Sequence, residues 1–341
     1  MSTLQSPSST TVLEHLEEDG PSQKCKGGNI SSLPNDIGPQ DKGFLNEYHG
    51  FWIPALATSG VIASQKYFQA RDTDILLVTP PKVGTTWSKA ILFALMNRIH
   101  YQDLQEHPLL TKIPHDLVPL LEGDIYTKKK VHDLNPAFPR LLSTHLPYVL
   151  LPTSVKDSTC KIVYVYRNAK DTFVSLWHFQ NRLYPTTASL EEAFNKFCKG
   201  MSPFGSYWDH VLSCWKKSIQ NPGRKMLFLK YEEMKEQPTT YLKRIAEFLD
   251  CPFSPEEEAK GTVNDISSLC SFDNLSNLDV NKSRKWCLPD HKMTLFSQGV
   301  DNAAFFRQGQ TGDWVNYLTS EMTEKLDHII EEKFHGIGLK F

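Results

Sequence analysis

The sequence predicts an α/β fold in which one domain is built on a central, mainly parallel sheet flanked by helices on both faces. Short apolar runs recur along the chain, helical patterns follow them, and a glycine-containing loop joins the first run to its helix. The runs are apolar at consecutive positions, as in parallel strands that helices cover on both faces. Repetition of strand and helix is typical of this fold class.

The strands and helices can be placed from these apolar patterns. Buried strands are predicted at residues 74–79, 140–143, 161–166 and 225–230. Helices are predicted at residues 86–97, 171–180, 191–199, 207–219, 239–249 and 320–333. Pro238 and Pro255 each suit the first turn of a helix, where a missing amide hydrogen costs no hydrogen bond. Ligands of such folds bind beyond the carboxyl ends of the strands, so a site is expected in the segments that follow them.

The chain divides into two parts by composition. Residues 1–43 are rich in Ser, Pro, Gly and charge, which predicts a disordered N-terminal tail. From Phe44 the composition is globular, so residues 44–341 are predicted to form one domain. The hydrophobic fraction of 40% is sufficient for a full core.

Bulk properties disfavour several classes of partner. The formal net charge of −2 lacks the basic excess of nucleic-acid-binding proteins. No apolar run reaches the roughly 18 residues of a membrane span, and the acidic N-terminus suits neither a signal nor a transit peptide. The seven cysteines form no CxxC pair, which points to a reducing compartment. We therefore expect a cytoplasmic protein that binds neither nucleic acid nor membrane.

The loop after the first predicted strand has the properties of a phosphate cradle. Gly84 permits a tight turn, Lys82 adds a positive charge, and the hydroxyls of Thr85 and Thr86 add donors. The start of the next helix favours an anion because its N–H groups and dipole point toward the loop. The loop is therefore P-loop-like in character. The alternative is a helix capped by Thr85 with a solvent-exposed lysine beside it.

The loop differs from that of magnesium-dependent nucleotide hydrolases. The GxxxxGK[ST] order is absent. The later predicted strands end at Arg167 and Tyr231 instead of at an aspartate that could hold Mg²⁺. A magnesium-dependent kinase or NTPase is therefore disfavoured, and we expect no metal.

Four ordered segments resemble those of the cytosolic sulfotransferase family. The segment Lys82-Val-Gly-Thr-Thr-Trp87 resembles the family's 5′-phosphosulfate loop, usually written PKxGTTW. The three others are Ser143-Thr-His-Leu-Pro147, Tyr166-Arg-Asn-Ala-Lys-Asp171 continuing to Ser175, and Phe305-Phe-Arg-Gln-Gly-Gln-Thr-Gly-Asp-Trp314. The resemblance covers about residue 50 to Phe341. The sequence of the segment Thr144-His-Leu-Pro-Tyr148 is most similar to that of the plant branch, whose members include flavonol, brassinosteroid and hydroxyjasmonate sulfotransferases.

This resemblance implies a donor, a reaction and a set of catalytic residues. The donor would be 3′-phosphoadenylyl sulfate, a co-substrate whose sulfuryl group passes to a hydroxyl of a small organic acceptor. His145 would be the general base, because imidazole titrates near working pH. Lys82 would stabilise the bridging oxygen, on which charge builds as the S–O bond breaks.

The resemblance also implies which residues hold the donor. Arg167 and Ser175 would bind the 3′-phosphate, for which a guanidinium is well suited. The donor site would further include the following residues, with Phe272 near the adenine ring: Val83, Gly84, Thr85, Thr86, Trp87, Tyr231, Arg307, Gln308 and Gly309.

The chain departs from the family pattern at two positions that could affect donor affinity and catalytic activity. Val83 stands where the family commonly has a hydroxyl residue, and Gln308 stands where it usually has lysine. A catalytically weak or inactive nucleotide-binding relative is therefore the alternative to an active enzyme. The segment 315–324 lacks the lysine and valine of the animal dimer motif, so we expect a monomer or weak homodimer.

The acceptor pocket is expected to be apolar with few polar groups. We expect residues 51–62, Phe179 with the residues numbered in the 180s, and the stretch 283–303 to line it, the last acting as a lid. The family resemblance allows a phenolic or flavonoid, a steroid or a hydroxyjasmonate-like acceptor, with a slight preference for a phenolic.

Overall fold

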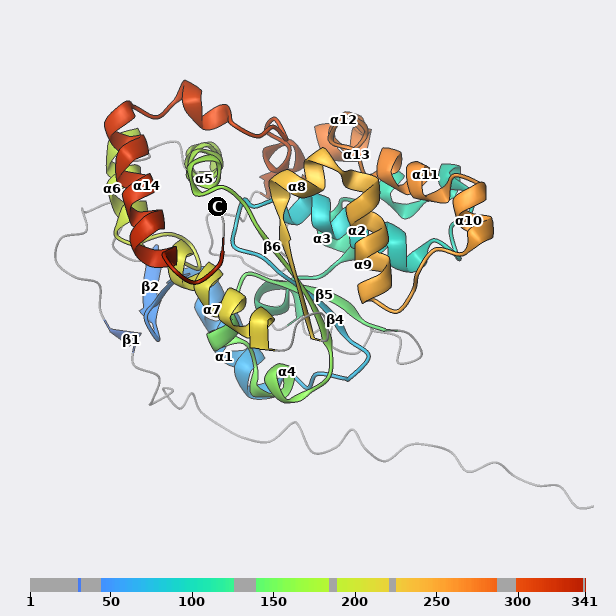
Figure 1. The fold of residues 1–341 in the computed structure, drawn as a ribbon, viewed down its shortest axis with the longest axis horizontal. Coiled ribbons are helices and arrows are strands. Elements are labelled where there is room, and N and C mark those ends of the chain that lie inside the picture. The colour runs from blue at the N-terminus through green and yellow to red at the C-terminus, as the bar shows by residue number, and fades with distance from the viewer. Residues whose placement is uncertain are drawn as a thin grey trace, which may run out of the picture.

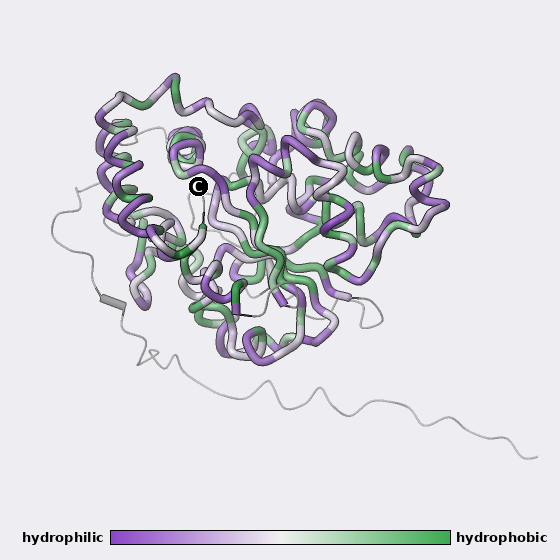
Figure 2. The backbone as a smooth tube through the Cα atoms, viewed as in Figure 1, coloured by the Kyte–Doolittle hydropathy of each residue, from purple (hydrophilic) through white to green (hydrophobic). Residues whose placement is uncertain are grey.

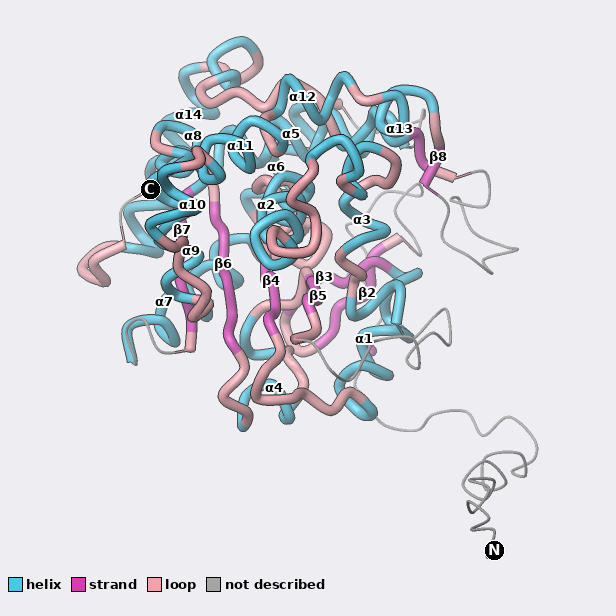
Figure 3. The backbone as a smooth tube through the Cα atoms, turned by 90° about the vertical axis from the view of Figure 1, so that its right-hand side faces the viewer, coloured by secondary structure: helices cyan, strands magenta, loops and turns pink. Residues whose placement is uncertain are grey.

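The computed structural model describes residues 30–31, 44–125, 139–183, 189–220, 225–286, 299–339 and 341. Its centre is a four-stranded parallel sheet in the order β5-β4-β6-β7 (Figure 1). The strands are β4 (Ile75–Val78), β5 (Leu141–Thr144), β6 (Lys161–Tyr166) and β7 (Met226–Lys230). Figure 3 shows them side by side. The predicted α/β class and parallel sheet are confirmed.

The helices cover both faces of this sheet, as Figure 1 shows. Their bounds are α1 (Ala55–Tyr67), α2 (Thr85–Asn97), α3 (Pro114–Leu117), α4 (Thr153–Asp157), α5 (Ala169–Leu183), α6 (Leu190–Cys198), α7 (Tyr207–Gln220), α8 (Tyr231–Glu236), α9 (Pro238–Phe248), α10 (Pro255–Ala259), α11 (Thr262–Leu269), α12 (Phe272–Asn277), α13 (Asp279–Ser283) and α14 (Ser320–Phe334). All six predicted helices are present within three residues at either end. Pro238 and Pro255 stand in the first turns of α9 and α10.

Alternate strand residues supply two separate cores. In β4, Ile75 and Leu77 pack with α2, α9 and α11, whereas Leu76 and Val78 pack with α5, α6, α7 and α14. All four side chains are at most 3% exposed. Burial on both faces explains why the strand is a continuous apolar run. In Figure 2 the hydrophobic colour is concentrated along these central strands.

The carboxyl ends of the four strands lie along one edge of the sheet. The parallel registers pair Val78 with both Thr144 and Tyr164, and Tyr166 with Lys230. The next residues include His145 after β5, Arg167 after β6 and Tyr231 after β7. The sheet therefore brings together side chains that are far apart in the sequence.

A small antiparallel sheet, which the sequence analysis did not predict, precedes the main one. It contains β1 (Ile30–Ser31), β2 (Leu45–Tyr48) and β3 (Phe51–Pro54). A tight turn at His49 and Gly50, both with positive φ, joins β2 to β3. The predicted tail 1–43 lies outside the described residues apart from β1.

A second pairing lies near the predicted lid. The strands β8 (Lys285–Trp286) and β9 (Val300–Asp301) are antiparallel, and most of the predicted lid between them lies outside the described residues. Among the described residues, no helix has the length and apolar character needed to cross a membrane.

Candidate active site

A cavity of about 500 Å³ lies at the carboxyl edge of the sheet. With one exception, the residues that the sequence analysis assigned to catalysis or donor binding line it. These are Lys82, Gly84, Thr85, Thr86, Trp87, His145, Arg167, Ser175, Tyr231, Arg307, Gln308 and Gly309. Five segments of the chain, spread from Lys82 to Gly309, therefore contribute to one cavity.

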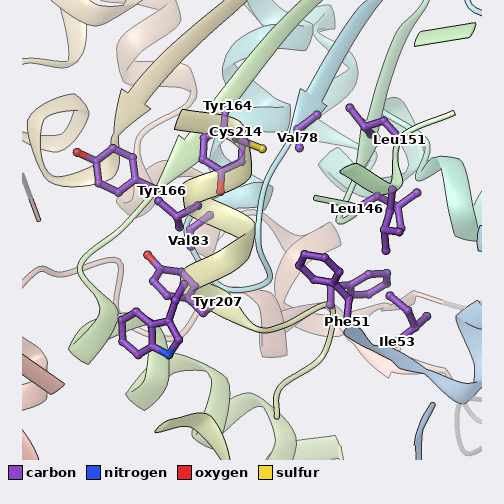
Figure 4. Packing of buried hydrophobic residues seen from close by; sticks show 14 of the residues in the cluster. Phe51, Ile53, Val78, Val83, Leu146, Leu151, Tyr164, Tyr166, Tyr207 and Cys214 are labelled. Carbon is purple, nitrogen blue, oxygen red and sulfur yellow. The ribbon is translucent and has the colours of Figure 1, made fainter. Parts of the chain in front are cut away.

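Val83 is the exception, because its side chain points away from the cavity. It is 0% exposed and belongs to the core that includes Tyr164, Tyr166 and Tyr207, as Figure 4 shows. The sequence analysis expected the missing hydroxyl at this position to cost a contact with the donor. A side chain that packs in the core makes no such contact, so only the backbone of Val83 can face a ligand.

The loop between β4 and α2 has a backbone conformation that brings it close to its neighbours. Gly84 has φ of 103° and precedes the first residue of α2. A β-carbon on Gly84 would lie 2.7 Å from the ring of Tyr231. Any larger residue would therefore force this loop away from the cavity.

The hydroxyls of the two loop threonines have different partners. Thr85 Oγ1 lies 2.9 Å from Thr79 Oγ1, and both residues are buried. Thr86 Oγ1 lies 3.1 Å from His115 Nε2. The sequence analysis predicted both hydroxyls as donors to an anion, but that of Thr85 is engaged within the protein.

Lys82 is held among cations and an aromatic ring. Its Nζ lies 3.9 Å from the centre of the Phe179 ring. Burial lowers the pKa of Lys82 to about 7, and the charges of Arg167, Arg307 and Arg182 act in the same direction. A group with this pKa takes up a proton readily when negative charge is brought beside it.

His145 follows β5 and is fixed by bonds at three atoms. Its Nδ1 lies 2.8 Å from the carbonyl oxygen of Thr79, so Nδ1 carries the hydrogen and Nε2 is left as a base. Its amide N–H donates to Glu122 and its carbonyl accepts from His210 Nε2. Burial lowers the pKa of His145 to about 3, aided by the nearby charge of Lys89.

Glu122 lies behind His145 and was not found from the sequence. Its carboxylate accepts from Thr144 Oγ1 and from the His145 amide, both at 2.7 Å. It is 0% exposed, and burial raises its pKa to about 7. The two bonds hold the end of β5, and with it His145, in place.

Arg167 follows β6 and has unused capacity for hydrogen bonding. It donates to the carbonyl of Gln310 at 2.5 Å, lies 3.6 Å from Asp171, and stacks over the ring of Tyr231 at 4.6 Å. Its Nε is buried and has no hydrogen-bond partner among the described residues. A buried guanidinium N–H at a cavity wall is suited to an incoming anion.

The segment 305–314 closes one side of the cavity through bonds to α5. The amides of Gly312 and Trp314 donate to Asp171 at 2.7 and 3.1 Å. Arg307 pairs with Asp313 at 2.5 Å. The amide of Gln308 can donate to both carboxylate oxygens of Asp313 at 3.1 Å.

Gly309 allows close contact between this segment and an aromatic ring. It has φ of +61°, and a β-carbon there would lie 2.4 Å from the Phe272 ring. The Tyr231 hydroxyl donates to the carbonyl oxygen of Gly309 at 3.2 Å. Tyr231 also meets Trp87 edge to face at 5.6 Å. These rings form an apolar wall suited to a planar base.

The other end of the cavity, near His145, is also aromatic. The ring of Phe305 contacts those of Phe179 and Trp286 there, with centroid separations of 5.6 and 6.0 Å. The predicted contributions of Phe179 and of the stretch 283–303 agree with this arrangement. Residues 51–62 were expected to line the pocket as well, but Phe51 and Ile53 are buried in the core.

Lys89 and His115 line the cavity and were also missed. Lys89 Nζ lies 3.1 Å from His115 Nδ1, and Lys89 is 1% exposed. A lysine directly before the apolar run of residues 90–96 was a signal that could have been used. His115 lies in a segment with no regular pattern, so nothing in the sequence singled it out.

The cavity fits a nucleotide that has anionic groups at two separate places. One group of cations and donors comprises Lys82, the loop amides and Thr86. A second comprises Arg167, Ser175 and Arg307, and includes the Arg167 Nε, for which the described residues offer no partner. The rings of Trp87, Tyr231 and Phe272 line the same cavity.

Comparison with known proteins gives a consistent result. The model of the sulfotransferase domain family matches residues 72–338. The chain is 46% identical to cytosolic sulfotransferase 5 of Arabidopsis thaliana over 318 residues, which cover 92% of this chain and 95% of the relative. It is 44% identical to cytosolic sulfotransferase 12 of the same plant, covering 98% of this chain and 99% of the relative.

Solved structures of sulfotransferases share the fold. An Arabidopsis thaliana putative steroid sulphotransferase matches with a TM-score of 0.70 and 42% identity, over 92% of this chain and 93% of that one. A mouse sulfotransferase complexed with PAP matches with a TM-score of 0.65 and 30% identity, over 86% and 95%. The chain therefore belongs to the family of plant cytosolic sulfotransferases, enzymes whose sulfuryl donor is 3′-phosphoadenylyl sulfate.

Proposed function

We propose that the protein transfers the sulfuryl group of 3′-phosphoadenylyl sulfate to a hydroxyl of a small aromatic acceptor, with His145 as general base. The observation that carries this proposal is the placement of His145 and Lys82 in one cavity, between a cationic donor end and an aromatic end. A base, a cation for the leaving group and an apolar acceptor wall are what the reaction requires.

His145 would take the proton of the acceptor hydroxyl. Its Nε2 is unprotonated because Nδ1 donates to the Thr79 carbonyl. As the proton passes to Nε2, the acceptor oxygen bonds to sulfur and the bond from sulfur to the bridging oxygen breaks. The products are a sulfate ester and adenosine 3′,5′-bisphosphate. The low pKa of His145 in the free protein means that the anionic donor is needed to stabilise the imidazolium.

Lys82 would stabilise the leaving oxygen. Negative charge grows on the 5′-phosphate as the S–O bond breaks, so a cation there stabilises the transition state more than the ground state. In the free protein Lys82 lies against Phe179, within the same cavity.

The remaining predicted residues would bind the donor. Arg167, Ser175 and Arg307 are proposed to hold the 3′-phosphate, with Gln308 and Gly309 closing over it. The backbone of Val83 and Gly84 and the hydroxyls of Thr85 and Thr86 would surround the 5′-phosphosulfate. The rings of Trp87, Tyr231 and Phe272 would contact the adenine.

The acceptor end of the cavity favours a planar phenolic compound. The rings of Phe179, Trp286 and Phe305 offer stacking surfaces, whereas His145 offers the polar contact that a phenolic hydroxyl needs. A relative of known structure is described as a putative steroid sulphotransferase, so steroids belong in any test. Other relatives are named cytosolic, which supports a cytoplasmic location for this protein.

The test is a transfer assay with 3′-phosphoadenylyl sulfate and a panel of phenols, flavonols, hydroxysteroids and hydroxyjasmonates, read by mass spectrometry. We expect a sulfated product from at least one phenolic compound. His145→Ala should lower the turnover rate by roughly 10²–10⁴-fold, whereas the variant should still bind the donor. Chelation of Mg²⁺ should leave the rate unchanged.

Two results would overturn the proposal. One is donor binding without transfer to any compound in the panel, which would indicate a nucleotide-binding relative. The other is transfer that survives His145→Ala at the wild-type rate, which would remove His145 as the base. Binding is followed by the rise in melting temperature that adenosine 3′,5′-bisphosphate produces.

A further inference from the structure

His115, which the mechanism above does not use, joins a buried lysine to the donor loop. It lies in the short helix α3, and its two ring nitrogens have different partners. Nδ1 lies 3.1 Å from Lys89 Nζ, and Nε2 lies 3.1 Å from Thr86 Oγ1. The ring is also packed against Phe305, with centroids 4.3 Å apart.

Lys89 determines which nitrogen of His115 carries the hydrogen. An ammonium group has hydrogen-bond donors and no acceptor, so the atom that it contacts must accept. Nδ1 is therefore unprotonated, and the single hydrogen of the neutral imidazole is on Nε2. Burial, Lys89, His145 and Lys82 hold the pKa of His115 well below its usual range, which keeps the ring neutral.

The position of the His115 hydrogen also determines which group donates in the bond to the Thr86 hydroxyl. A threonine hydroxyl has one hydrogen to donate and two lone pairs to accept with. Because His115 Nε2–H donates to Thr86 Oγ1, the hydroxyl acts as the acceptor in that bond. Its own hydrogen remains available for another acceptor, and Thr86 lines the cavity.

We propose that His115 is a positioning residue: held in its Nε2–H form by Lys89, it directs the Thr86 hydroxyl hydrogen toward the 5′-phosphate group of the donor. This inference rests on the proposed donor site. It assigns a role to two residues outside the four family segments. In this series of hydrogen bonds, Lys89 donates to His115, His115 donates to Thr86, and the Thr86 hydroxyl donates to the anionic phosphate.

The two loop threonines thereby differ in function. Thr85 and Thr79 share a hydrogen bond between their hydroxyls, and Thr85 is 7% exposed. Thr86 has its orientation imposed by His115 from the side of α3. Preorganised donors aimed at an anion cost no reorganisation when the ligand arrives.

A double-mutant cycle tests the inference. The variants are His115→Phe, Thr86→Val and the double mutant, and the measurement is the Kd of adenosine 3′,5′-bisphosphate by titration calorimetry. We expect His115→Phe to weaken binding by about tenfold. The double mutant should be no weaker than Thr86→Val, since His115 acts through that hydroxyl.

Further variants separate positioning from structural support. His115→Gln can donate an amide hydrogen to Thr86 and should recover most of the affinity. Lys89→Met frees the His115 tautomer and should weaken binding severalfold, whereas Lys112→Met removes an exposed charge from the neighbouring segment and should leave the Kd unchanged. If His115→Phe does not fold, the Lys89→Met and His115→Gln pair provides the same comparison.

The outcomes distinguish this inference from the proposed function. If the wild-type protein fails to bind the nucleotide, the proposed donor site is wrong. If it binds, but His115→Phe and Thr86→Val weaken binding independently, His115 does not act through Thr86. An unchanged Kd for both His115→Phe and Lys89→Met would likewise overturn the inference.

Discussion

The imidazole Nδ1 of His145 lies 2.8 Å from the carbonyl oxygen of Thr79, the residue that follows strand β4. The amide of Thr79 in turn donates to the carbonyl of Thr144 at 3.1 Å. The His145 side chain is therefore bonded to the start of the loop that joins β4 to α2, and a separate backbone bond joins the two strands beside it. A change that preserves these strands can remove the base without moving the loop.

Because the backbone bond between the two strands does not involve the imidazole, replacing His145 should affect catalysis without affecting donor binding. His145→Ala should lower kcat by roughly 10²–10⁴-fold and change the Kd of adenosine 3′,5′-bisphosphate by less than threefold. Steady-state kinetics and calorimetry on the same preparation check it. Loss of nucleotide binding in a folded variant would contradict the independence of loop and base.

Lys82 should take up a proton when the nucleotide binds. Its pKa is about 7 in the free protein because of burial and neighbouring arginines, and bound phosphate raises it. Affinity should therefore increase as pH falls from about 9 to 7, with net proton uptake near pH 8. Calorimetry in buffers of different ionisation enthalpy measures that uptake, and Lys82→Met should remove it. Equal heats in all buffers would contradict the assignment.

Gly309→Ala should weaken nucleotide binding through a steric effect. The new β-carbon would lie 2.4 Å from the Phe272 ring, and the positive φ adds strain of roughly 1 kcal/mol. We expect at least a tenfold rise in Kd. Gly312→Ala is the matched control, because it has φ of +81° but nothing within 4 Å of the added carbon. Equal effects of the two variants would show that strain alone matters.

Gln308→Lys should strengthen nucleotide binding. Gln308 lines the cavity beside Arg307, and a lysine there adds a positive charge near the proposed 3′-phosphate site. A gain of roughly 1 kcal/mol, about fivefold in Kd, is expected at low salt. The gain should shrink between 50 and 500 mM salt, because the Debye length falls about threefold over that range and the added charge is more strongly screened. A Kd that is unchanged at low salt would mean that position 308 does not face the phosphate.

Acid should destabilise the fold through its buried histidines. Burial lowers the pKa of His107 and of His210 to about 4, whereas the unfolded chain titrates near 6.5. The unfolded state therefore binds more protons below pH 6.5, so the stabilisation present above that pH is lost as pH falls toward 4. Each group contributes up to about 1.4 kcal/mol per pH unit in that range. Urea unfolding from pH 7.5 to 5 measures the slope.

A pair of variants isolates one of these groups. His107→Gln should flatten the pH dependence of the unfolding free energy, even though it lowers stability at pH 7.5. The exposed Gln102→Asn, which changes no titratable group, should leave the slope unchanged. Identical slopes for His107→Gln and the wild type would exclude His107 as a source of acid sensitivity.

The sheet, the main helices and most residues that line the cavity could be predicted because each has a local signature. The strands are continuous apolar runs, and the donor loop combines Gly84 with Lys82 directly before a helix. The small sheet was missed although His49 and Gly50 form a recognisable turn, because β2 and β3 are short and only partly alternating. The helix α1 contains Gly60 and several β-branched residues, which weaken the helical signal.

The contacts behind the site could not be predicted, since they depend on packing. Glu122, Lys89 and His115 come from three segments that the sheet brings together, and no spacing rule connects them. Val83 was misread for the same reason: whether its side chain faces the cavity or the core is set by the turn of the loop.

The proposed donor site and the proposed acceptor wall come partly from different segments, and this affects how the acceptor specificity of the enzyme can change. His145, Arg167 and Tyr231 directly follow the ends of strands in the main sheet, and Lys82 lies in the loop after β4. The aromatic acceptor wall comes partly from Trp286 and Phe305, on and beside the separate β8–β9 pairing. Substitutions there can exchange one acceptor for another while the chemical machinery stays in register, so new substrates can be acquired without rebuilding catalysis.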